Sequence, residues 1–96
     1  VVDAVNTTHE NPRFLAGASL APSLRATTDM DEALRGAALV VYAAPSHVLR
    51  AVVASAKRAI AEGTVLAVAT KGIERETMAL MTDVVVQESP NHDVVA

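Results

Sequence analysis

Two apolar runs without a charged residue constrain the fold more than any other feature of this chain. Residues 37–44 read AALVVYAA and residues 64–70 read TVLAVAT, and each precedes a segment in which apolar side chains recur at helical spacing. Long apolar strands are typical of parallel sheets, because helices cover both faces of such sheets. The alternation of these runs with helical segments predicts an α/β fold whose parallel strands are joined by right-handed crossovers.

Helices are predicted from apolar spacing and from the residues that begin or end them. Asp29 is expected to cap a short helix that ends at Gly36, with Glu32 completing a capping box. Ser46 is expected to cap the helix that follows the first apolar run. The other predicted helices lie at the N-terminus and over about residues 75–88.

Each predicted helix has one apolar face that we expect to be buried. The inward residues are Met30, Ala33, Leu34 and Ala37 in the second helix, Val48, Leu49, Val52, Val53, Ala56 and Ile60 in the third, and Met78, Met81, Val84 and Val85 in the fourth. Leu24–Thr28 alternates like an edge strand, and residues 91–96 begin a further strand. The predicted order is therefore α, β, α, β, α, β, α, β.

Composition argues against several classes of function. The net charge is −3 and the aromatic side chains are Phe14 and Tyr42, so the chain offers neither a basic surface nor stacking platforms for nucleic acid. It has no cysteine, which excludes disulfides and is compatible with a reducing cytoplasm, and His9, His47 and His92 lack metal-ligand spacing. No apolar run approaches the roughly 20 residues that cross a bilayer. We therefore expect no nucleic acid, membrane or metal partner.

The two strand-to-helix turns are the places where a ligand is expected. In open parallel sheets, ligands bind beyond the carboxyl ends of the strands. The turn at residues 43–47 offers small side chains, the Ser46 hydroxyl and a helix N-terminus, which suit a flat or anionic ligand. The residues alone leave open that Ser46 only caps the helix.

The second turn, at residues 69–74, carries a cation. Lys71 follows an uncharged strand, and its field is poorly screened there and acts strongly on a phosphate or a polarised carbonyl. Gly72 lets the backbone turn away without placing a side chain in the site. The alternative is a solvated lysine at a strand end, paired with Glu74.

Several motifs occur in an order that points to a known family. Residues 6–15 read NTTHENPRFL, residues 26–29 read ATTD, residues 44–46 read APS and residues 70–74 read TKGIE. Together they resemble the nicotinamide-binding domain of the NAD(P)-dependent glycerol-3-phosphate dehydrogenases, over essentially all 96 residues. The first and last motifs are the specific ones. His47 stands where the family usually has Gln and Ala16 where it often has Pro, and neither change removes a group that the chemistry needs.

This resemblance implies a partial Rossmann-type fold, a doubly wound parallel sheet, with residues 1–96 as part of an NAD(P)-binding domain. The glycine-rich loop and the first two strands of the family are expected before Val1. The helical domain, with the lysine that transfers the proton, is expected after Ala96, so this segment holds no catalytic residue. Because the first two strands would lie between Leu24–Thr28 and the strand at residues 39–44, we expect the segment alone to be poorly stable and inactive.

The resemblance also implies an activity and its site. The complete enzyme would be soluble, cytoplasmic and homodimeric, and would interconvert dihydroxyacetone phosphate and sn-glycerol 3-phosphate with NAD or NADP, feeding glycerophospholipid synthesis. Lys71 would bind the phosphorylated triose substrate and border the cofactor. Ala44, Pro45 and Ser46 would lie against the dinucleotide, and Val48 near the nicotinamide.

Two alternatives stay open. One is another Rossmann-type dehydrogenase of 2-hydroxyacids or phosphosugars, such as the 6-phosphogluconate and ketopantoate enzymes, against which the loop at residues 11–15 argues. The other is a small nucleotide-binding module without enzymatic activity. Such a module should carry its own glycine-rich or acidic pocket, and the sequence shows neither.

Overall fold

The computed structural model describes residues 1–96, which form two compact units, Val1–Ala33 and Leu34–Ala96. The helices and strands are α1 (Val2–Thr7), α2 (Met30–Leu34), β1 (Leu39–Tyr42), α3 (Leu49–Ala56), the 3-10 helix η1 (Lys57–Ala59), β2 (Val65–Val68), α4 (Met81–Glu88) and β3 (Val94–Val95). No helix is long and apolar enough to cross a membrane.

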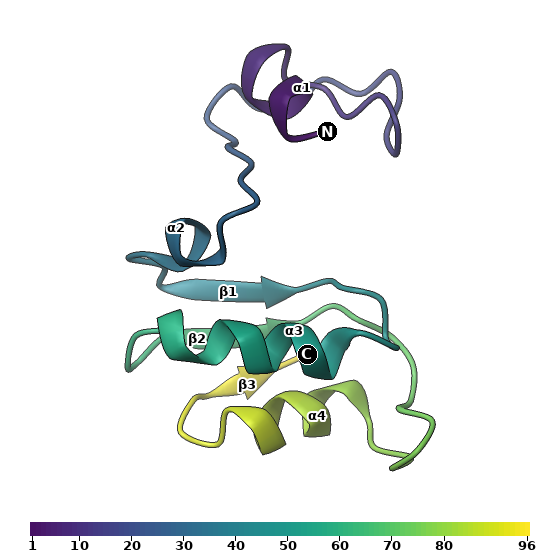
Figure 1. Ribbon diagram of the computed structural model, residues 1–96, viewed down its shortest axis with the longest axis vertical. Coiled ribbons are helices and arrows are strands. Elements are labelled where there is room, and N and C mark those ends of the chain that lie inside the picture. The colour runs from purple at the N-terminus through teal and green to yellow at the C-terminus, as the bar shows by residue number, and fades with distance from the viewer. The chain divides into compact units, whose positions relative to one another are not determined.

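The second unit is built on a three-stranded parallel sheet in the order β1-β2-β3 (Figure 1). In this sheet Leu66 of β2 lies opposite Val40 of β1 and Val94 of β3. Each crossover contains a helix, α3 between β1 and β2 and α4 between β2 and β3. The α/β architecture with parallel strands is therefore confirmed.

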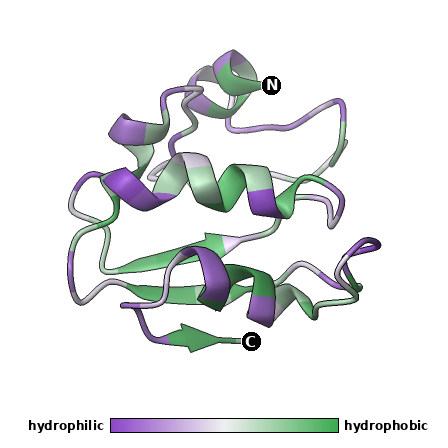
Figure 2. Ribbon diagram, turned by 60° about the horizontal axis from the view of Figure 1, so that its bottom comes forward, coloured by the Kyte–Doolittle hydropathy of each residue, from purple (hydrophilic) through white to green (hydrophobic).

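Helices cover one face of this sheet, where the sequence predicts cover on both. Figure 1 shows α3 and α4 on the same side of the strands. Burial alternates accordingly along β1, where Val40 and Tyr42 are buried while Leu39 and Val41 are more than half exposed. The expectation of a strand buried on both faces is thus wrong for β1. Figure 2 shows the strands coloured hydrophobic, and the exposed side chains of β1, Leu39 and Val41, are both apolar.

The core lies between the sheet and the inner faces of α3 and α4. Its fully buried side chains are Leu49, Val53, Leu66, Val84 and Val85. Val48 and Val52 are half-buried, while Ala56 and Ile60 are buried, so the predicted inner face of α3 is correct. Its spacing of three and four residues determined this outcome, because such residues share one side of a helix.

The structure differs from the sequence prediction at two places, in the segment before α2 and in α2 itself. No strand forms at Leu24–Thr28. The backbone of Ala26 is instead bonded to the side-chain amide of Asn6: Nδ2 donates to the Ala26 carbonyl and Oδ1 accepts from its N–H, each at 2.8 Å. In α2, Leu34 is buried and Ala37 half-buried after it, whereas Met30 and Ala33 are exposed, contrary to expectation.

The N-cap of α2 is confirmed, but the capping box is not formed as expected. Asp29 Oδ1 accepts from the N–H groups of Asp31 and Glu32 at 3.0 and 3.3 Å. The Asp29 N–H instead donates to the Thr27 hydroxyl oxygen. This hydroxyl in turn donates to Glu32 Oε2 at 3.3 Å. Thr27 therefore stands between the cap and the glutamate that was expected to close the box.

The helices of the second unit begin later than predicted. α3 starts at Leu49 after a turn at residues 46–48, and its N-cap, Val48, makes no side-chain cap bond, so the prediction that Ser46 caps it is wrong. α4 starts at Met81 rather than near residue 75.

A closed loop replaces the first part of the predicted fourth helix. Residues Ile73 and Leu80 form an antiparallel bridge, and the Glu74 N–H donates to the Ala79 carbonyl at 2.9 Å. Within this loop Met78 has a φ of +60° and a side chain that is 71% exposed, although helical spacing placed it in the core. Met81 is buried as expected.

Candidate functional site

The two turns predicted to bind a ligand lie side by side at the carboxyl edge of the sheet. We call residues 44–46 the first turn and residues 70–74 the second turn. The Thr70 hydroxyl donates to the carbonyl of Ala44 at 2.7 Å, and the Ala69 N–H donates to the Tyr42 carbonyl at 2.8 Å. The first bond joins the two turns across a sequence separation of 26 residues, and the second joins the strand ends that precede them.

Gly72 brings the second turn against Ser46. Its φ is +120°, a conformation that other L-residues rarely adopt, and a β-carbon on it would lie 3.5 Å from Ser46 Cβ. The φ value favours glycine at this position, whereas the space would admit a β-carbon in ordinary van der Waals contact with Ser46.

The predicted ligand-contacting residues differ in exposure. Pro45 and Lys71 are exposed, and Ala44, Ser46 and Val48 are half-buried. Lys71 takes part in none of the ion pairs of the structure, so the alternative that it pairs with Glu74 is wrong.

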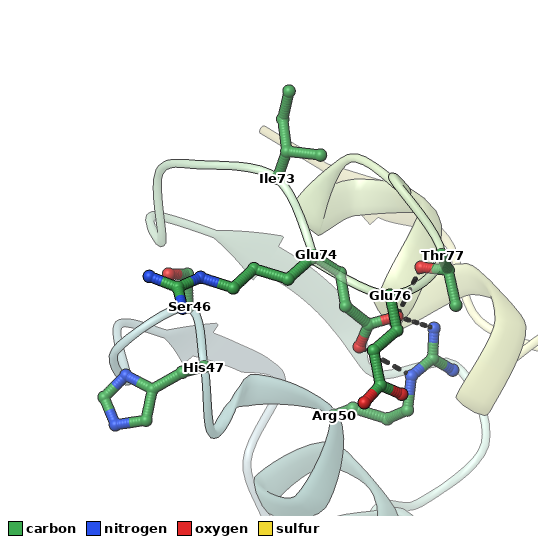
Figure 3. Close-up of a pocket in the computed structure, with 8 residues that line it drawn as sticks. Ser46, His47, Arg50, Ile73, Glu74, Glu76 and Thr77 are labelled. Atoms are coloured by element: carbon green, nitrogen blue, oxygen red, sulfur yellow. Dashed lines mark hydrogen bonds and ion pairs between the residues drawn. The ribbon is translucent and has the colours of Figure 1, made fainter.

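A cavity of about 770 Å³ opens beside the two turns (Figure 3). Eight residues line it, namely Ser46, His47, Arg50, Ile73, Glu74, Arg75, Glu76 and Thr77. Of the predicted site residues only Ser46 is among them. The cavity is therefore displaced from the first turn toward the start of α3 and toward the loop after the second turn.

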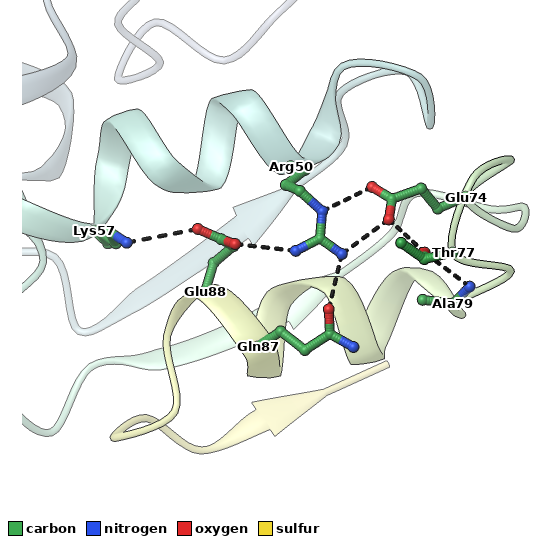
Figure 4. A network of polar contacts seen from close by, with 7 residues as sticks. All are labelled: Arg50, Lys57, Glu74, Thr77, Ala79, Gln87 and Glu88. Atoms are coloured by element: carbon green, nitrogen blue, oxygen red, sulfur yellow. Dashed lines mark hydrogen bonds and ion pairs between the residues drawn. The ribbon is translucent and has the colours of Figure 1, made fainter.

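Glu74 forms a partly buried ion pair with Arg50 of α3, which the sequence did not predict (Figure 4). Arg50 Nε donates to Oε2 at 2.8 Å and Nη2 donates to Oε1 at 2.9 Å, so the guanidinium binds both carboxylate oxygens. The Thr77 hydroxyl also donates to Oε1, at 2.5 Å. Nothing in the local sequence of Arg50 or Glu74 points to a partner 24 residues away.

The same guanidinium also contacts the end of α4. Arg50 Nη1 donates to Glu88 Oε2 at 3.0 Å and Nη2 donates to Gln87 Oε1 at 2.8 Å. Lys57 Nζ lies 3.5 Å from the other oxygen of Glu88. This network therefore links α3, the loop after the second turn and the C-terminal end of α4.

The ion pair between Arg50 and Glu74 shifts the pKa of both side chains. Hydrogen bonds from Arg50, then from Thr77, lower the pKa of Glu74 to about 2 from its ordinary value of 4.5. The bond to Glu74 raises the pKa of Arg50. Burial raises the pKa of Tyr42, whose hydroxyl lies in the core without a hydrogen-bond partner.

Acid should weaken the protein through Glu74. Because its pKa is depressed in the folded state, its ionised form contributes stability above about pH 4.5, and this contribution is lost as the pH falls toward about 2. In Glu74→Gln this contribution is absent at every pH. We therefore expect the free energies of unfolding of the full-length wild type and of Glu74→Gln to converge as the pH falls from about 6 to about 3, measured by urea unfolding. A difference that stays constant over that range would contradict the assignment.

The three histidines have different surroundings. His47 lines the cavity, His92 Nδ1 lies 3.0 Å from the Thr64 carbonyl, and His9 belongs to the first unit with a φ of +58°. No group of three or more His, Asp or Glu side chains is arranged to hold a metal ion.

A parallel sheet with helical crossovers and adjoining turns at its carboxyl edge is typical of the Rossmann-type class of α/β domains. The sequence profile described as NAD-dependent glycerol-3-phosphate dehydrogenase N-terminus matches residues 1–96. The chain belongs to this family, which confirms the resemblance seen in its motifs.

Individual relatives agree with the family. The chain is 46% identical over 83 residues to a glycerol-3-phosphate dehydrogenase (NAD(P)+) of Myxococcus xanthus, covering 86% of this chain and 25% of the relative. It is 43% identical over 96 residues to the enzyme of the same name from Thermobifida fusca, covering 98% of this chain and 29% of the relative. The chain therefore spans about a quarter of the length of these relatives.

A solved structure shows the same fold. The crystal structure of glycerol-3-phosphate dehydrogenase from Coxiella burnetii superposes with a TM-score of 0.83 at 27% identity, covering 98% of this chain and 29% of that chain. The Rossmann-type fold class predicted from sequence is thereby confirmed.

Proposed function

We propose that residues 1–96 form part of the NAD(P)-binding domain of a glycerol-3-phosphate dehydrogenase, which interconverts dihydroxyacetone phosphate and sn-glycerol 3-phosphate. The contact between the two turns carries this proposal. The bond from Thr70 to Ala44 and the approach of Gly72 to Ser46 place the segment that bears Lys71 beside small side chains at the carboxyl edge of the sheet.

The residues of this edge fit a dinucleotide. Ala44, Pro45 and Ser46 have small side chains that would let a flat ring approach the backbone, and the half-buried Val48 would add an apolar surface for the nicotinamide. The one carboxylate of the second turn, Glu74, is neutralised by Arg50, so it does not repel phosphate. NAD or NADP bound here would supply the hydride chemistry.

Lys71 is proposed to bind the substrate. Its ammonium is exposed and makes no ion pair, so it is free to attract the phosphorylated triose and to stabilise negative charge on the C2 oxygen. In the direction of reduction, the C2 carbon gains a hydride and its oxygen gains a proton, while the nicotinamide is oxidised. The proton comes from a donor outside residues 1–96, as the family resemblance implies.

The setting of the enzyme is part of the proposal. Curated relatives named glycerol-3-phosphate dehydrogenase (NAD(P)+) support a small-molecule substrate and a nicotinamide cofactor. We place the complete enzyme in the cytoplasm as a homodimer whose product feeds glycerophospholipid synthesis. Size-exclusion chromatography with light scattering tests the dimer.

The activity is tested on the full-length protein that contains this chain. We expect NADH or NADPH to be oxidised on addition of dihydroxyacetone phosphate, followed at 340 nm, with one equivalent of glycerol 3-phosphate formed. Ketopantoate and 6-phosphogluconate with the matching cofactor serve as controls. Turnover of either control without turnover of dihydroxyacetone phosphate would assign another dehydrogenase, and absence of cofactor turnover with all three would favour a binding module.

A further inference from the structure

Lys71 sits on a segment that has little stiffness of its own. It is followed by Gly72, which lacks a side chain and tolerates many backbone conformations, and its own side chain is exposed. Thr70 fixes the start of the second turn through its bond to Ala44. The direction in which Lys71 points therefore depends on what holds the far end of the turn, at Glu74.

Arg50 holds that far end. Its planar guanidinium binds both oxygens of Glu74, at 2.8 and 2.9 Å, in the two-pronged geometry that fixes orientation as well as distance. The Glu74 N–H is also tied to Ala79, so main chain and side chain are both anchored. Lysine at position 50 has one ammonium and does not reproduce this geometry.

Arg50 is itself too occupied to bind an anion well. Gln87 and Glu88 take further N–H groups of the guanidinium, at 2.8 and 3.0 Å. Since arginine has five N–H donors in all, four of the five are engaged by Glu74, Gln87 and Glu88. Although Arg50 lines the cavity, its bonds are directed to the protein.

From this arrangement we infer that Arg50 is a positioning residue for Lys71. Through Glu74 it ties the far end of the second turn to α3, so that the ammonium of Lys71 stays in the place where the substrate would bind. This role rests on the proposed function. In this role Arg50 does not contact the substrate, but it determines how well Lys71 binds the substrate.

Steady-state kinetics of the full-length enzyme test this role. We expect Arg50→Met to lower kcat/KM for dihydroxyacetone phosphate about tenfold, because a displacement of about 1 Å in a binding group costs one to two orders of magnitude. The change should appear mainly in KM for dihydroxyacetone phosphate, with KM for the cofactor less affected. Glu74→Gln should behave alike, and Arg50→Lys should recover part of the loss. Loss of folded protein would lower the apparent kcat and leave KM unchanged.

Lys57→Met is the matched control. Lys57 belongs to the same network, contacts Glu88 on the side away from Glu74, and is 44% exposed. Its removal should leave kcat/KM within about twofold of the wild type, since exposed ion pairs contribute little.

A double-mutant cycle with Lys71 decides the question. If Arg50 acts through Lys71, Arg50→Met should cause little further loss in a Lys71→Ala background. An equal fold-loss in both backgrounds would overturn the inference, as would Arg50→Met kinetics that match those of Lys57→Met. Either result is compatible with a wild type that reduces dihydroxyacetone phosphate and with a Lys71→Ala variant of lower activity. In that case the inference about Arg50 fails, but the proposed function does not. A wild type that does not reduce this substrate overturns both.

Discussion

Replacing Lys71 by Ala in the full-length enzyme should lower kcat/KM for dihydroxyacetone phosphate about 10²-fold or more. Lys71 is exposed at the carboxyl edge of the sheet and is engaged in no ion pair. Its charge is therefore available to the phosphate and to the oxygen that gains negative charge during hydride transfer. A cation held beside this oxygen stabilises the charge that develops in the transition state more than it stabilises the neutral ketone, so its removal slows the reaction.

The chain supplies its own control for this substitution. Lys57 is its other lysine, and it lies on η1, away from both turns. Lys57→Ala should retain near wild-type kcat/KM under the same conditions. Equal kinetics for the two alanine variants would show that Lys71 has no part in the reaction.

Leu66→Ala should produce the largest loss of stability. Leu66 lies on the central strand β2, is fully buried, and pairs in register with Val40 and Val94. Truncation of the side chain to Ala leaves a cavity. Because β2 is held between two neighbouring strands, the surrounding structure cannot easily close this cavity. We expect a cost of about 3 kcal/mol in the free energy of unfolding, within the range for buried leucines.

Denaturant unfolding of the full-length protein, monitored by hydrogen exchange of the β2 amides, measures this cost. Leu66→Met is the control, because it keeps the side-chain volume and should cost less than about 1.5 kcal/mol. Similar values for the two variants would contradict the view that packing around Leu66 stabilises the sheet.

Much of the second unit follows from local sequence. The apolar runs yield β1 and β2, and the spacing of Leu49, Val53 and Ala56 yields the buried face of α3. The position of the two turns was also predictable, because the carboxyl ends of parallel strands meet at one edge.

The loop at residues 73–80 was not predictable in the same way. Met78 lies at helical spacing from Met81, Val84 and Val85, and this spacing predicts a helix from about residue 75 with Met78 inside. In the structure this segment forms a closed loop instead. Ile73 and Leu80 form a bridge, the Glu74 N–H donates to the Ala79 carbonyl, and the Glu74 carboxylate binds Arg50. Tertiary contacts of this kind override local preference.

The sequence by itself determined the parallel strands, the family and the two turns at the carboxyl edge of the sheet, because hydropathy, spacing and motifs are properties of neighbouring residues. Only the tertiary structure decided that Glu74 pairs with Arg50, that Asn6 takes the backbone of Ala26, and that α3 and α4 share one face of the sheet. These outcomes depend on which distant segments are packed together. A side chain's hydrogen-bond partner is the group that packing brings within about 3 Å, and no local pattern specifies it.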